Sequence, residues 1–110
     1  MKIISLPSET FDSLANALAK DSTIGWKKLM LKGFSHIYSQ DDVNEIEQKP
    51  SPAIILLNDL VAREESVKNL MRALEKIGNL RAISIIKNGL YHHYRTFKTG
   101  QNVSDVLLLL

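Results

Sequence analysis

The stretch VKNLMRALEKIGNL, residues 67–80, carries the clearest structural signal in the chain. Ser66 stands before it where a helix N-cap is expected, and Gly78 stands where a helix would end. Its apolar residues recur every three or four positions, which is the spacing of one helical face: Val67, Leu70, Met71, Leu74 and Ile77. The spacing therefore predicts an amphipathic helix that has to bury this face against neighbouring elements.

Five further segments show helical spacing, each bounded by capping or breaking residues: 7–20, 26–33, 39–48, 52–62 and 80–89. In the fourth of the six predicted helices, Ser51 is the expected cap and Pro52 the expected first residue. No segment shows a convincing strand alternation. The connections are short, so the sequence predicts an all-α fold, a six-helix antiparallel bundle.

The predicted helices also predict a core, in which the single tryptophan, Trp26, is the largest side chain. Leu29 and Met30 beside it mark the buried side of the second helix, so we expect the Trp26 ring to pack inside the bundle. The predicted core residues are Leu14, Leu18, Trp26, Leu29, Val43, Ile46, Ile55, Leu56, Leu70, Leu74, Ile77 and Ile83.

Length and composition fit a small single domain in a reducing compartment. A chain of 110 residues is the size of one domain, and the absence of cysteine excludes disulfide scaffolds and thiol chemistry. The net charge of +2 implies no general attraction to nucleic acid or anionic lipid, and no apolar run is long enough to insert into a membrane. We expect a cytoplasmic protein with a folded domain over residues 1–87. Residues 88–110 are expected to form a tail or linker, with a short helix at 104–110 capped by Ser104.

Catalysis by this domain is not expected. The chain has no cysteine nucleophile, no glycine-rich phosphate loop and no histidine pair four residues apart. His36, His92 and His93 are too few and too scattered in sequence for a zinc site, so we expect no metal and no cofactor.

Several pieces of the chain, in their order and spacing, resemble a death domain. They cover roughly residues 6–87 and read LANALA, GWKKLM, DDVNEIEQ, SPAIILL, VKNLMRALEKIGNL and RAISII. The start LPSETFDSLANAL, followed by GWKKLM and KGFSHIYSQDDVNEIE, is most similar to death domains of Toll and interleukin-1 receptor signalling. That group includes Tube, Pelle and the interleukin-1-receptor-associated kinases. Because some of its members are kinases, the resemblance leaves open a kinase domain in a longer parent chain.

The resemblance implies a non-catalytic adaptor-like module that binds other death domains, in innate immune signalling, with recruitment to receptors at the membrane. It also implies three pairs of complementary surface patches. In the first pair, Lys27, Lys28 and Lys32 of the second helix face Glu9, Asp12 and Asp59 of the first and fourth helices. In the second, Asp59, Arg63, Glu64 and Glu65 face Lys76, Arg81 and Lys87. In the third, Asp41, Asp42, Glu45 and Glu47 of the third helix face Lys20 and Lys49.

Other interpretations stay open at this point. Trp26 could be an exposed contact, and each charged residue could simply be part of a solvated surface. The domain could serve apoptotic or other death-domain receptors. YHHYRTFK, residues 91–98, interleaves aromatic and basic side chains as a nucleic-acid contact would, although no helix carries the dense basic stripe that phosphate contacts require. We expect partners to be other death domains, without nucleic acid.

Overall fold

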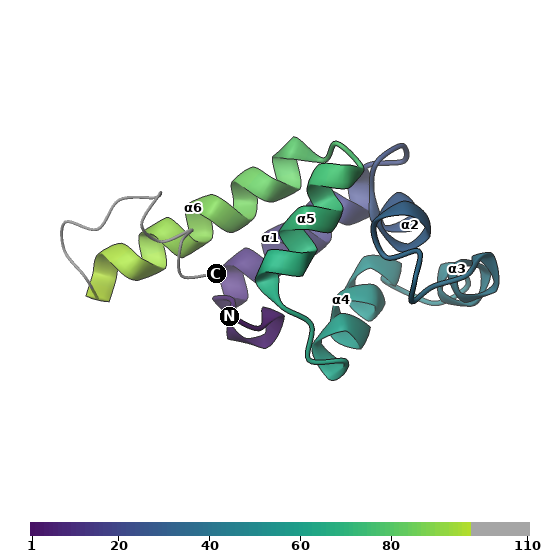
Figure 1. Cartoon of the computed structure of the whole chain (residues 1–110), viewed down its shortest axis with the longest axis horizontal. Coiled ribbons are helices and arrows are strands. Elements are labelled where there is room, and N and C mark those ends of the chain that lie inside the picture. The colour runs from purple at the N-terminus through teal and green to yellow at the C-terminus, as the bar shows by residue number, and fades with distance from the viewer. Residues whose placement is uncertain (98–110) are drawn as a thin grey trace.

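The structure, a computed structural model, describes the backbone of residues 1–97 and the side chains of residues 1–91. These residues form six α-helices and two short helical segments, with no strand among them, so the predicted all-α six-helix fold is confirmed (Figure 1). The elements are η1 (Ile3–Ser5), α1 (Ser8–Lys20), α2 (Trp26–Lys28), η2 (Leu29–Gly33), α3 (Gln40–Glu47), α4 (Pro52–Ala62), α5 (Val67–Lys76) and α6 (Leu80–Phe97).

Helix α1 is the central element of the bundle. It packs against α6 on one side and against α4 on another, while α5 packs against α6 and against the π-helical segment η2. Helix α3 contacts α4 and η2 and lies at the end of the molecule opposite the C-terminal end of α6 (Figure 1). The bundle therefore has one projecting helix at each end.

Local capping accounts for where α3 and α5 begin. At α3, the Ser39 side chain accepts a hydrogen bond from the Asp42 backbone N–H, and the Asp42 carboxylate accepts one from the Ser39 N–H at 2.8 Å. At α5, the Ser66 hydroxyl accepts from the Asn69 N–H at 3.0 Å. Ser51 differs from its prediction as a cap, since its side chain makes no capping hydrogen bond and its backbone is left-handed, with φ of 53°. Helix α4 depends instead on Pro52, whose fixed φ suits a first helical position.

The buried face of each helix agrees with the predicted core at most positions. Of the predicted residues, the buried ones are Leu14, Leu18, Trp26, Leu29, Val43, Leu56, Leu70, Leu74 and Ile77, and Ile46 and Ile83 are half-buried against them. Ile55 differs from the prediction, because the buried face of α4 is made by Ala53, Leu56, Leu57 and Leu60. The Ile55 side chain falls beside that face, half-buried, in a groove between α3 and α4.

Trp26 is held in the core by the residue that precedes it. The Trp26 side chain is 8% exposed, and Gly25 lies against the C-terminal end of α1. A Cβ atom at Gly25 would lie 2.1 Å from the Asp21 carbonyl oxygen and 2.4 Å from that of Leu18. Only glycine permits this approach, which brings α2 onto the end of α1 with the indole facing inward.

The sixth helix is longer than predicted. It continues through Asn88 and Gly89 to Phe97, so the predicted end of this helix at 88–89 is wrong. The reason is a helix contact: a Cβ at Gly89 would lie 2.0 Å from the Thr10 hydroxyl oxygen of α1. Gly89 permits close packing of α6 on α1 and does not terminate the helix. The short helix predicted at 104–110 lies outside the described residues.

The N-terminal segment forms a strap across the turn between α4 and α5, a feature that helical periodicity could not predict. Ile3 is fully buried, and its N–H donates to the Glu65 carbonyl at 3.0 Å. The Val67 N–H donates to the Met1 carbonyl at 2.9 Å, and the Lys2 ammonium pairs with the Glu64 carboxylate at 2.9 Å. The first residues therefore fix the geometry of this turn.

We expect Trp26→Ala to destabilise the fold by about 3–5 kcal/mol, because it removes a buried aromatic ring and leaves a cavity beside Leu29 and Met30. Urea unfolding followed by helical circular dichroism measures this loss. A variant with the wild-type unfolding midpoint would contradict the assignment of Trp26 to the core.

Candidate protein-interaction surfaces

The basic surface predicted on the second helix is present, but one of its lysines is already engaged. Lys27 forms an ion pair with Glu47 of α3, and its ammonium lies 5.7 Å from the centre of the Trp26 ring. Lys28 and Lys32 are exposed, and neither forms an ion pair within the described part of the chain. These two lysines are the cations that α2 and η2 offer to a partner.

One residue of the acidic surface predicted to face these lysines is already engaged within the chain. Glu9 and Asp12 lie one turn apart on α1, exposed and without an ion pair among residues 1–91. Asp59 of α4 is instead directed toward Tyr38 and Arg63, in the groove between α3 and α4. The free acidic residues of this surface are therefore those of α1.

Asp59 belongs to an internal network. Its carboxylate accepts a short hydrogen bond from the Tyr38 hydroxyl and one from the Arg63 Nε at 2.8 Å, while the Arg63 guanidinium lies 5.4 Å from the Tyr38 ring centre. Burial disfavours the charge on Asp59. The hydrogen bonds from Tyr38 and Arg63 and the positive charge of Arg63 outweigh it, so the Asp59 pKa lies below its usual range.

The Tyr38 pKa is raised, first by burial and then by the adjacent Asp59 carboxylate. The network therefore favours a neutral tyrosine beside an ionised aspartate at neutral pH. Sequence reasoning did not identify Tyr38, because it lies in the connection between η2 and α3 with no motif around it.

The two surfaces of the second predicted pair differ in how many of their charged side chains have partners within the chain. On the turn between α4 and α5, Arg63 pairs with Asp59, Glu64 pairs with Lys2, and Glu65 accepts hydrogen bonds from Asn69 and from the Ser66 N–H. On the turn between α5 and α6, Lys76 and Arg81 are exposed and form no ion pair with any described residue.

Leu80 stands between these two cations in the chain and is 70% exposed, so this turn also presents an apolar side chain to solvent. The turn before α6 is therefore the more available of the two surfaces.

Most acidic side chains of α3 also have partners within the chain. Asp42 caps the helix, Glu45 pairs with Lys49 at 3.7 Å, and Glu47 pairs with Lys27. Asp41 is exposed and has no ion-pair partner in the region that the structure describes. Asp41 is thus the acid of α3 that has neither an ion pair nor a capping role among the described residues.

A comparison with protein-family models matches residues 8–90 to the death domain, and the chain belongs to this family. No curated protein and no solved structure matches the chain. Death domains are protein–protein interaction modules in signalling and are generally non-catalytic, which agrees with a site made of surface patches.

Two further observations concern membranes and metals. No helix in the described part of the chain is both long and apolar enough to span a bilayer. Among the same residues, no cluster of three histidine or acidic side chains could hold a metal ion.

We expect Asp59→Asn to lower stability by about 1 kcal/mol at neutral pH, because it removes the charged acceptor of two hydrogen bonds. The loss is small because solvent screens the interactions of a partly exposed carboxylate. A carboxylate with a lowered pKa stabilises the fold fully above its unfolded value of about 4, and this contribution is lost as pH falls through the folded value. Urea unfolding across the acid range should therefore show the two proteins converging at low pH. Asp12→Asn, at an exposed carboxylate, is the matched control; an equal effect there would contradict the role of the network.

Proposed function

We propose that this death domain is an adaptor-like module that assembles with other death domains in Toll and interleukin-1-type innate immune receptor signalling. The proposal combines the family with the likeness of LPSETFDSLANAL, GWKKLM and KGFSHIYSQDDVNEIE to that group of death domains. It places the domain in the cytoplasm, with recruitment to receptors at the membrane through its partners.

The observation that carries the assembly is the separation of unpaired charges. Lys28 and Lys32 lie on α2 and η2, whereas Glu9 and Asp12 lie on α1, and none of these four side chains forms an ion pair among the described residues. Most other acidic groups of the bundle are paired or capped internally. These four side chains therefore give one basic and one acidic surface available to partners.

Two complementary surfaces on different faces of one domain give an asymmetric contact. The basic surface of one domain meets the acidic surface of the next, and each added domain presents a new free surface. Such charged contacts steer and select a partner more than they add affinity, because an exposed ion pair contributes less than about 1 kcal/mol. We therefore expect assembly to depend on salt concentration.

Light scattering of the purified domain, alone and mixed with death domains of receptors, adaptors and kinases of the Toll and interleukin-1 pathways, tests the proposal. The expected result is a complex larger than a dimer that shrinks at high salt. Binding confined to death domains of apoptotic receptors would overturn the assignment to Toll and interleukin-1-type signalling. A chain that stays monomeric in every mixture would overturn the proposed assembly altogether.

We expect Lys28→Glu to weaken this assembly about tenfold or more at low salt, because it places like charges opposite each other. Its unfolding midpoint should stay near the wild-type value, since Lys28 is exposed. Lys68→Glu is the matched control, as Lys68 is an exposed lysine of α5 outside the predicted patches. Equal weakening by both changes would mean that net charge alone governs assembly.

A further inference from the structure

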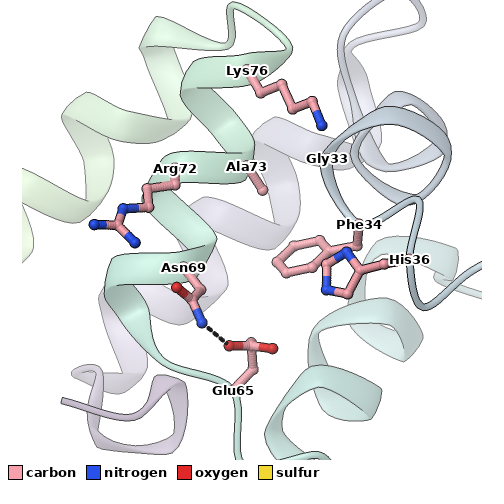
Figure 2. Close-up of a pocket in the computed structure, with 8 residues that line it drawn as sticks. All are labelled: Gly33, Phe34, His36, Glu65, Asn69, Arg72, Ala73 and Lys76. Atoms are coloured by element: carbon pink, nitrogen blue, oxygen red, sulfur yellow. Dashed lines mark hydrogen bonds between the residues drawn. The ribbon is translucent and has the colours of Figure 1, made fainter.

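A notch of about 250 Å³ lies between α5 and the chain that follows η2. Figure 2 shows Phe34 and His36 on one side of it and residues of α5 on the other. The two sides meet closely at Gly33, where a Cβ atom would lie 3.0 Å from the Ala73 Cβ. The floor is apolar, because Phe34 and Ala73 are buried at 2% and 4% exposure.

The rim of the notch carries more positive than negative charge, with two cations, Lys76 and Arg72, and one acid, Glu65. Lys76 reaches across its upper edge toward Gly33, and Arg72, one turn earlier on α5, points to the outer side of the helix (Figure 2). Neither forms an ion pair with a described residue. The one acid at the rim, Glu65, already accepts hydrogen bonds from the Asn69 amide at 2.8 Å and the Ser66 N–H at 3.0 Å.

These features favour a carboxylate as the ligand of the notch. The Lys76 ammonium supplies three donors, and the His36 ring lies exposed beside Phe34, with 6.2 Å between the ring centres. An apolar floor below a cation lowers the local dielectric, which strengthens the attraction for an anion that enters.

The chain itself carries an acidic side chain suited to this notch. Asp41 is exposed in the first turn of α3, and it is the acid of that helix that remains without an ion pair or a capping role among residues 1–91. Helix α3 lies at one end of the bundle (Figure 1), so it can approach a second molecule without the other helices intervening. Glu9 and Asp12 are exposed as well, but they form the acidic surface of α1 that the proposed function already pairs with Lys28 and Lys32.

We propose that the notch is a contact surface between copies of this chain, in which Lys76 of one copy receives Asp41 of the next. The contact is asymmetric, because the notch and α3 lie on different parts of the bundle, and repeated addition extends the assembly head to tail. The inference rests on the proposed function and adds a surface on α5 to the patches on α1, α2 and η2.

Sedimentation velocity of the purified chain over a range of concentrations, at low and high salt, tests this contact. The wild-type chain should self-associate at low salt, and Lys76→Glu should weaken self-association about tenfold or more, because a like charge then faces Asp41. Lys68→Glu, two turns earlier on α5 and outside the notch, is the matched control and should behave as wild type. Circular dichroism spectra and unfolding midpoints establish that each variant is folded.

A charge swap makes the test specific for the two residues. Asp41→Lys alone should also lose self-association, because the introduced lysine faces Lys76. Mixing Asp41→Lys with Lys76→Glu should restore it, since each contact in an alternating assembly then joins opposite charges. Failure of the mixture to recover, with both variants folded, would overturn the pairing.

The results also separate this inference from the proposed function. A chain that is monomeric alone but binds another death domain, with sensitivity to Lys28→Glu, would overturn the notch contact and leave the proposed function standing. Self-association that Lys28→Glu abolishes and Lys76→Glu leaves unchanged would do the same. A chain that binds neither itself nor any death domain would overturn both.

Discussion

The fold depends on close backbone contacts that set α2 and α6 against the central helix α1. At Gly25, the absence of a side chain lets the start of α2 lie directly on the last carbonyl groups of α1. At Gly89, it lets α6 lie on Thr10. These two contacts bring the apolar faces of three helices within packing distance, and the core that runs from Ile3 to Leu90 forms around them. Trp26 is buried because Gly25 fixes the position from which its ring enters.

The same packing decides which charges are available for binding. Lys27 of α2 forms an ion pair with Glu47 of α3. Lys2, in the N-terminal strap that crosses the turn before α5, forms an ion pair with Glu64. Each such pair contributes little to stability, because both partners are exposed. Their main consequence is to neutralise part of the surface. The charges without an ion pair among the described residues include Lys28, Lys32, Lys76, Arg81, Glu9, Asp12 and Asp41.

Comparison of particular positions shows what could be predicted. The stripe from Val67 to Ile77 and the cap at Ser66 were predicted because both depend on residues within one or two turns. At Gly89, the local sequence predicts a helix end, because glycine is the usual residue just after a helix C-terminus. Its actual role is to fit against Thr10, which lies far away in sequence. For Ile55, its hydrophobicity predicts a core position, but the face on which α4 is buried depends on the helices around it.

The sequence by itself determined the helices, most of the core and the family, because periodicity, capping residues and their order are properties of neighbouring residues. Tertiary structure alone decided that Lys27 and Lys2 pair with Glu47 and Glu64, that Tyr38 reaches Asp59, and that Phe34 and Ala73 form the floor of a notch below Lys76. The physical reason is that these contacts, unlike the i,i+4 pairs Glu45–Lys49 and Asp59–Arg63, join side chains from different elements. Their partners are fixed only when the helices have packed.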